Sequence, residues 1–310
     1  MIPESGLRRA EGEQLHRGAE LALAEANASQ ARFALVVRAD DKLWGAGSRE
    51  AVELVSGEQV WALLGAVDSA SAHVIEQIAM KTRIAFLTPW ASDPTLTQIG
   101  IPWLFRCVPD DDRQAASLAH WIFIAQHLRR VGTVVAGDRS ARIAADAFAK
   151  AAAKAGHSIP AGRRWELAAD PNRPTPLPAS VLQALDRERL EGVVLFGPDT
   201  WTASVEDALR QRHAAERVLT PPSQLAIGKK FRDAFRARYG TPPAPAAAFA
   251  YDAAWALLRA IDSVAAAGPL DRASIRDALA RTNFEGATGT VQFDSKGNRI
   301  GADWSEPILH

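Results

Sequence analysis

The chain has 310 residues, which suits two domains of about 150 residues each better than one. Hydrophobic residues make up 47% and charged residues 23%, a composition typical of globular proteins with an ample core. Lys plus Arg (36) equals Asp plus Glu (36), so no overall field favours nucleic acid or an anionic membrane surface. No apolar run approaches the ~18–20 residues that a membrane-spanning helix needs.

The first residues of the sequence lack the pattern of a signal peptide, which is a basic segment followed by an apolar segment and small residues. Residues 1–6 begin as though the chain were cut immediately after a strand. Apolar residues at helical spacing predict a helix over 13–27. The apolar, β-branched run 33–37 predicts a buried strand, and a helix is expected over 48–56.

Residues 60–97 contain two consecutive strand–turn–helix units. The apolar run 61–67 leads into the polar turn 68–71 and a helical pattern, and the apolar run 84–87 leads into 88–94. In a parallel sheet both turns lie at the carboxyl ends of neighbouring strands, where open α/β folds bind ligands. The first turn also begins a helix, whose unpaired N–H groups suit an anion. This pair of turns is therefore predicted to form a small-molecule site.

The same alternation continues to about residue 212 and predicts parallel sheets with helices on both faces. The acids at 110–112 are expected to cap a helix rather than hold a divalent cation. Further elements are an extended piece at 102–106, strands at 131–136 and 192–196, and helices ending near residues 127, 155, 190 and 212.

After Arg212 the regular alternation of predicted strands and helices stops. Only the short apolar pair 218–219 precedes a series of helices, predicted at 227–239, 247–266 and 272–281. Residues 290–293 alternate with period two, and 294–298 form a turn with a glycine, which together predict a hairpin-like tail.

Enzyme signatures are absent from the sequence. It contains no G-x-S-x-G, H-E-x-x-H or G-x-x-x-x-G-K-[ST] motif. The seven histidines are not spaced with other metal-ligating residues, and His73 is expected to be a surface or capping residue. Cys107, the single cysteine, cannot form an internal disulfide and is expected to be a core thiol. Neither a cofactor nor a metal is expected, and the chain is predicted not to be an enzyme.

Polar residues after the strands remain as candidate ligand-binding residues. Ser69 could give its hydroxyl and N–H to a ligand carboxylate, or Asp68 or Ser69 could simply cap the helix. Ala91 and Ser92 could offer a carbonyl and a hydroxyl to an ammonium or amide, or the turn could only start the helix after Asp93.

Four further residues could wall or complete the pocket. Trp90, with Trp44, could form an apolar wall, although core packing explains each tryptophan equally well. Asp199 could meet a cation from the other lobe or cap a helix. Tyr251 lies on an amphipathic helix, where packing in the core is the alternative.

In these residues the chain resembles the type I periplasmic solute-binding proteins of ABC importers, in the branch of leucine/isoleucine/valine-binding proteins and related receptor ligand-binding domains. The resemblance implies two α/β lobes joined by three crossings, with the ligand in the cleft and closure by hinge bending. It also implies that Ser69 holds a ligand α-carboxylate and that Ala91 and Ser92 lie beside the α-amino group. The matching segments are 11–14, 18–22, 65–71, 88–92, 103–106, 109, 231–240, 250–253 and 289–297.

The chain also departs from the family pattern. The first strand is missing, no tyrosine stands near Ser140, and roughly one strand–helix unit is skipped between Arg212 and Val218. In the family that unit carries the acid that pairs with an amino-acid ammonium. The fold expected is thus two doubly wound parallel-sheet lobes with a shortened second lobe.

The predicted lobes are 1–110 with 244–298, and 111–243 with 299–310. The predicted function is binding of a small carboxylate-bearing solute, such as an amino acid or analogue, for delivery to an ABC permease. A ligand-sensing regulatory domain is the alternative, and a hydrolase or transferase would need a nucleophile–base pair that the sequence does not show. The resemblance implies a periplasmic location, while the lack of a signal sequence leaves the cytoplasm open.

Overall fold

The computed structural model describes residues 1–4, 8–39, 46–168, 178–197, 205–209, 218–219 and 227–301. The chain divides into two compact units. Unit 1 comprises Met1–Ser5, Glu11–Asp110 and Ala226–Asp303, and unit 2 comprises Gly6–Ala10, Asp111–Leu225 and Trp304–His310. Residues 226–243 and 299–303, which the sequence assigns to the second lobe, therefore fall within unit 1.

Unit 1 is built on a parallel sheet of three short strands in the order β1-β2-β3. The strands are β1 (Ala62–Leu64), β2 (Ala85–Thr88) and β3 (Leu104–Arg106), and every residue of β2 and β3 is buried. Apolar strands covered on both faces are what parallel sheets require, because their crossover helices lie on both sides. The predicted α/β class with parallel sheets is confirmed.

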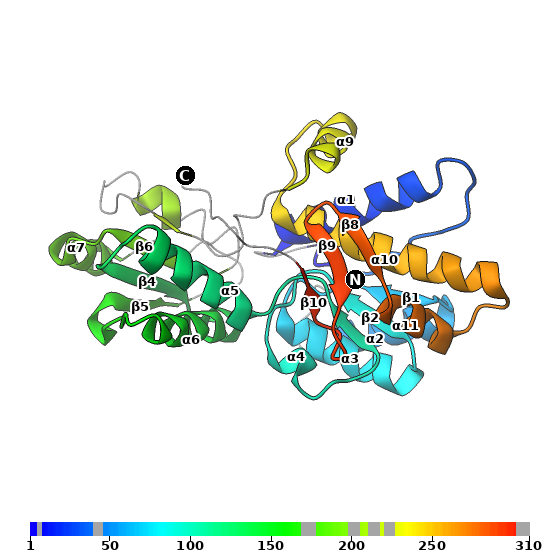
Figure 1. Cartoon of the computed structure of the whole chain (residues 1–310), viewed down its shortest axis with the longest axis horizontal. Helices are drawn as coiled ribbons and strands as arrows, with labels where there is room; N and C mark the ends of the chain where they lie inside the picture. Colours follow the sequence, from blue (N-terminus) through cyan, green and yellow to red (C-terminus); the bar gives the residue numbers. More distant parts are fainter. Residues whose placement is uncertain are drawn as a thin grey trace. The chain divides into compact units, whose positions relative to one another are not determined.

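Helices cover both faces of this sheet (Figure 1). Successive strand residues point to opposite faces. Accordingly, Leu63 packs in a cluster with Ile75 of α3 (Ser69–Thr82), whereas Leu64 packs against Ala254 of α10 (Pro245–Ala267). The α3 side also receives α2 (Ala46–Val52) and the π-helical turn η1 (Glu53–Gly57), and the α10 side receives α1 (Arg9–Ala26).

The strand predicted at 33–37 is wrong. These residues carry no strand ladder and are mostly exposed or half-buried. The chain's first two residues lie between them and the sheet: the Met1 ammonium donates to Leu64 O (2.7 Å), and Ile2 forms a parallel bridge with Ala39. An apolar run becomes a strand only where a neighbouring strand pairs with its backbone, and 33–37 has no such neighbour among the described residues.

The opposite edge of the sheet, beside β3, is covered by the C-terminal hairpin. Strands β8 (Asn283–Gly286), β9 (Gly289–Phe293) and β10 (Arg299–Ile300) form an antiparallel sheet in the order β10-β9-β8. Its turn reaches β3, where Arg106 N donates to Gly297 O (2.8 Å). Gly297 has φ +81°, and a Cβ there would lie 2.2 Å from Leu104 O, so a larger residue would separate the turn from the sheet. The remaining helices of unit 1 are α4 (Thr95–Gln98), α9 (Lys229–Tyr239) and α11 (Arg272–Ala280).

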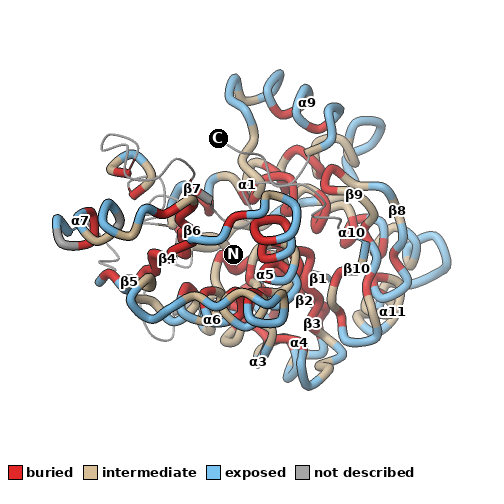
Figure 2. Tube along the Cα trace, turned by 60° about the vertical axis from the view of Figure 1, so that its left-hand side comes forward, coloured by how far each residue is buried: buried red, intermediate tan, exposed pale blue. Residues whose placement is uncertain are grey.

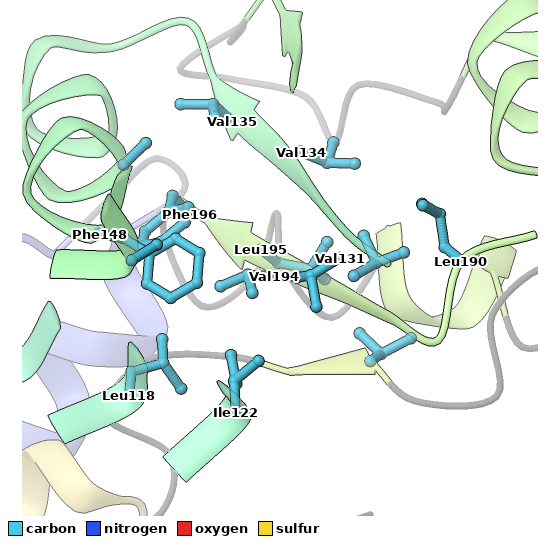
Figure 3. Close-up of a cluster of buried hydrophobic side chains, with 14 of the residues drawn as sticks. Leu118, Ile122, Val131, Val134, Val135, Phe148, Leu190, Val194, Leu195 and Phe196 are labelled. Carbon is cyan, nitrogen blue, oxygen red and sulfur yellow. The ribbon is translucent and has the colours of Figure 1, made fainter. Parts of the chain in front are cut away.

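Unit 2 holds a four-stranded parallel sheet in the order β5-β4-β6-β7. All residues of β4 and β6 are buried, and Figure 3 shows their valines and leucines packed with Phe148 and Phe196, whose ring centroids lie 5.7 Å apart. Figure 2 shows that β4 and β6 are buried while the outer faces of the helices are exposed. The strands are β4 (Val131–Ala136), β5 (Arg164–Leu167), β6 (Gly192–Phe196) and β7 (Val218–Leu219), and the helical elements are α5 (Asp111–Ala119), η2 (His120–Ala125), α6 (Arg139–Lys154), η3 (Ala161–Arg163) and α7 (Ala179–Glu188).

A buried ion pair fastens the hairpin to α10. Asp252 of α10 accepts hydrogen bonds from the N–H groups of Ala287 (2.6 Å) and Thr288 (2.9 Å), and Arg299 Nη1 lies 3.7 Å from its Oδ2. Arg299 also donates to the carbonyls of residues 288–290. Burial raises the pKa of Asp252, although Arg299 and the hydrogen bonds act in the opposite direction. Neither side chain is exposed, so each depends on the other for compensation.

We therefore expect Asp252→Ala to lower the free energy of unfolding by about 3–5 kcal/mol, because it strands a buried guanidinium and two buried N–H groups. Asp262→Ala is the matched control. It removes an acid from the same helix, but one that is half exposed and paired at the surface with Arg32, and it should change stability by less than about 1 kcal/mol. Urea unfolding measures both variants, and equal losses would contradict this role for the pair.

Candidate functional site

The turns after β1 and β2 are joined by a hydrogen bond at the carboxyl edge of the unit 1 sheet. Asp68 is the N-cap of α3, and its Oδ1 accepts from Ser71 N (2.8 Å). Asp68 therefore caps the helix, and Ser69 does not, because its hydroxyl has another partner. Its Oγ accepts from Asp93 N (3.1 Å), across 24 positions of sequence. Two turns that are distant in the chain thus meet at one point.

Donors gather around Ser69. Because its Oγ already accepts a hydrogen bond, its O–H remains a donor, and no described residue accepts it. The first-turn N–H groups of Ser69 and Ala70 likewise have no acceptor in the described part of the chain, as expected at a helix start. The helix dipole adds positive potential there. A hydroxyl and two amides at a helix N-terminus can together receive a carboxylate.

The second turn supplies acceptors. Thr88, fully buried at the end of β2, accepts from Ala91 N (3.2 Å) through its hydroxyl and so closes the turn. Ala91 is 1% exposed and Ser92 half-buried. Within the described ranges, neither the carbonyl of Ala91 nor the hydroxyl of Ser92 has a hydrogen-bond partner. Groups of this kind can accept from an ammonium or an amide, as the sequence predicts.

Asp93 anchors the turn rather than facing a ligand. Its carboxylate is buried and accepts from Thr95 N (2.9 Å) and Thr95 Oγ1 (2.7 Å) at the start of α4. His73, predicted to be a surface or capping residue, lies beside this anchor. Its ring contacts Glu76 Oε2 and Thr95 Oγ1, each at 3.2 Å.

The remaining predicted site residues are not all brought together. Trp90 lies within the turn after β2, residues 89–94, hereafter the site turn. Its side chain is half-buried and packs on Phe249 with ring centroids 5.8 Å apart. Tyr251 lies elsewhere: its hydroxyl donates to Glu25 Oε2 (2.6 Å) of α1, and its ring packs on Phe231 (4.8 Å) of α9. Burial, the larger cause, and Glu25 both raise the pKa of Tyr251. Asp199 and Trp44 lie outside the described residues.

Sequence reasoning missed Arg106, the last residue of β3. Its guanidinium is buried and donates to Asp93 O (2.7 Å), directly behind the site turn. The available signal was its position, because a single arginine stands between the apolar residues 103–105 and 107–108. A charged side chain inside an apolar run is buried only where it has several partners.

The described residues show neither a cluster of three or more side chains suited to a metal ion nor a helix long and apolar enough to cross a membrane. A profile of the periplasmic binding protein family matches residues 1–195 and 174–305, which is nearly the whole chain. The chain belongs to the periplasmic binding protein family. This is a class of binding proteins rather than enzymes, as the sequence predicts.

Solved structures of solute-binding proteins share the fold. The branched-chain amino acid transporter substrate-binding protein LivJ of Streptococcus pneumoniae, in complex with isoleucine, has a TM-score of 0.79 and 20% identity over 96% of this chain and 91% of that one. An ABC transporter solute-binding protein of Rhodopseudomonas palustris, in complex with 3,4-dihydroxybenzoic acid, has a TM-score of 0.83 and 16% identity over 97% and 89%.

A plant receptor resembles part of the chain more closely in sequence. Glutamate receptor 2.9 of Arabidopsis thaliana is 36% identical over 84 residues, which is 27% of this chain. The match spans only 9% of that receptor's length.

The chemical reactivity of Cys107 provides a test of whether this edge of the sheet is buried. Its amide donates to Thr88 O (2.8 Å), its thiol is fully buried, and burial raises its pKa to about 12. The reactive thiolate is therefore negligible at pH 8, and the folded protein should not be alkylated by iodoacetamide over hours. The unfolded protein in urea should be labelled stoichiometrically within minutes. Mass spectrometry reads both states, and rapid labelling of the native protein would contradict the burial.

Proposed function

We propose that the chain is a solute-binding protein that holds a small carboxylate-bearing molecule at the carboxyl edge of the unit 1 sheet. Several polar groups that have no hydrogen-bond partner among the described residues lie around the Ser69–Asp93 hydrogen bond, and this arrangement carries the proposal. Ser69 contributes its hydroxyl and N–H to the carboxylate, and Ala91 and Ser92 contribute acceptors to a neighbouring polar group of the ligand. Buried groups without partners cost free energy, so a ligand that pairs them gains affinity.

An amino acid suits this arrangement, because its carboxylate and ammonium are adjacent and match the donors and acceptors respectively. The isoleucine held by the Streptococcus pneumoniae protein supports this class. Small aromatic acids are the second class, since the Rhodopseudomonas palustris protein holds a dihydroxybenzoic acid. They share the carboxylate but lack the ammonium, so they would use the Ser69 side of the site alone. Trp90 beside the turn could border the body of either ligand.

We further propose that Asp199 contributes from unit 2 and that ligand binding favours a closed arrangement of two lobes, which an ABC permease in the periplasm reads. A ligand shifts such an equilibrium only by its differential affinity for the two states. The proposed lobes are those of the sequence prediction, except that residues 226–243 and 299–303 belong to the first lobe. Tyr251, whose hydroxyl is held by Glu25, is the least suited of the predicted site residues to contact ligand directly.

A ligand-sensing regulatory domain of the same fold is the second candidate. The observation that favours it is the 84-residue similarity to a plant glutamate receptor. In that case closure would act on a signalling partner instead of a permease. Pull-down of the purified protein with its genomically adjacent membrane proteins separates the two, because only the transport role requires a permease.

A thermal-shift screen tests the binding proposal. We expect an L-amino acid, a small amide or an aromatic acid such as benzoate to raise the melting temperature, since a ligand at 100 times its Kd adds about 2.7 kcal/mol of stability. A panel of all twenty amino acids, their amides and benzoates without any shift would refute it.

For any ligand found, Ser69→Ala should weaken binding by about 1–3 kcal/mol, the scale of a hydrogen bond to a charged group. Ser71→Ala is the matched control in the same helical turn. It lies two positions on, about 200° around the helix from Ser69, and should leave the affinity unchanged. Isothermal titration calorimetry measures both, and an unaltered Kd for Ser69→Ala would remove this residue from the site.

A further inference from the structure

Arg106 is wholly buried, and its guanidinium joins three segments that are distant in sequence. Nη1 donates to Asp93 O (2.7 Å) in the site turn. Nη2 donates to Thr97 Oγ1 (2.8 Å) in α4 and to Asn298 Oδ1 in the hairpin turn. The same nitrogen lies 3.4 Å from Asp110 Oδ2, on the last residue of unit 1 before the chain passes into unit 2.

These contacts fix Asp93 completely. Its N–H donates to Ser69 Oγ, its carbonyl accepts from Arg106, and its carboxylate accepts from Thr95. The residue after it is Pro94, whose ring limits the backbone on that side. Among these contacts, the one from Arg106 is made by a residue of strand β3, so it ties the turn directly to a third strand of the sheet.

The orientation of Ser69 depends on this constraint. Asp93 N–H occupies an acceptor position of the serine hydroxyl and so directs its O–H elsewhere. If the backbone at Asp93 were to shift, the hydroxyl would lose the hydrogen bond that it accepts from Asp93 N and could turn back into the protein. A site whose donors are held in place before the ligand arrives binds more tightly, because less ordering occurs on binding.

We propose that Arg106 is a positioning residue: by binding the carbonyl of Asp93, its guanidinium holds the backbone of this residue in place, so that the Asp93 N–H orients the Ser69 hydroxyl toward the ligand, and it links this turn to the hairpin turn at Asn298. The part of this proposal in which Ser69 is oriented toward a ligand rests on the proposed function. The part in which Arg106 holds the site turn in place concerns the ligand-free protein and does not depend on that function. The link also places one side chain in contact with the site turn and with Asp110, at a crossing between the units.

Another fully buried arginine of unit 1, Arg299, separates this role from general stabilisation. It is equally buried and also has several partners. These include Asp252, the carbonyls of residues 288–290, Thr288 Oγ1 and Cys107 Sγ, and none of them belongs to the site turn. Lysine in place of either arginine keeps the charge but loses the planar fork that binds several acceptors at once. Arg106→Lys and Arg299→Lys therefore form a matched pair.

Amide hydrogen exchange measured by NMR on the ligand-free protein tests the proposal. In Arg106→Lys the Asp93 amide should exchange about 10-fold faster than in the wild type, because the turn opens locally. The Phe86 amide in β2, which donates to Trp103 O (2.8 Å), serves as the internal reference and should change no more than it does in Arg299→Lys. Equal acceleration at Asp93 in the two variants would overturn the proposal.

If Arg106→Lys does not fold, Asn298→Ala takes its place. This variant keeps the arginine and removes its hairpin partner, together with the side-chain hydrogen bonds of Asn298 to Thr97 and Asp294. We expect about 3-fold faster exchange at Asp93. No change there would overturn the link to the hairpin.

L-isoleucine and benzoate, used as probes, give the ligand-bound readout. Where a probe binds the wild type, Arg106→Lys should weaken it about 10-fold, and Arg299→Lys less than about 2-fold. If neither probe binds the wild type, the proposed ligand class fails, while exchange at Asp93 still decides whether Arg106 positions the turn.

Discussion

The hydrogen bond from Asp93 N–H to Ser69 Oγ is the constraint on which the candidate site depends. It joins the turn after β1 to the turn after β2, which are otherwise separate loops on neighbouring strands. By occupying an acceptor position of the serine, it leaves a donor for a ligand. The same bond brings the donors at the start of α3 next to the acceptors of Ala91 and Ser92. A hydroxyl that both receives and gives a hydrogen bond can serve in the fold and in binding together.

Two buried arginines hold the parts of unit 1 that helix packing alone would leave loose. Arg299 fastens the hairpin to α10 through Asp252, and Arg106 fastens the hairpin turn and the site turn to β3. Most of their partners are carbonyl, hydroxyl or amide oxygens rather than carboxylates. A guanidinium supplies five N–H groups in fixed directions, so it can satisfy several loop carbonyls that have no strand or helix to pair with. Such loops remain ordered without a regular hydrogen-bond ladder.

The sequence predicts those elements whose signal is local. Residues 131–136 and 192–196 are continuous apolar runs, and both are strands with the predicted bounds. The helix predicted at 13–27 lies at Arg9–Ala26. The run at 33–37 is just as apolar but is no strand, because a strand needs a neighbour and hydrophobicity does not supply one. Conversely β8, Asn283–Gly286, has no buried face and no apolar pattern, so its pairing with β9 could not be foreseen.

The candidate site divides in the same way. That polar residues after β1 and β2 would meet follows from parallel pairing, which places the carboxyl ends of neighbouring strands together. The role of Arg106 does not follow, because its partners include residues 4, 9, 13 and 192 positions away and none is marked by a motif. For Tyr251 the pattern leaves two alternatives, a site residue or a core residue, because an amphipathic helix shows which face is buried but not what that face contacts. In the structure Tyr251 contacts α1 and α9. The groups proposed to recognise a ligand head group thus lie at strand ends that the sequence can locate. The groups that hold them in place come from contacts across the fold, and a carboxylate shared by many solutes leaves selectivity to the residues around the ligand's body.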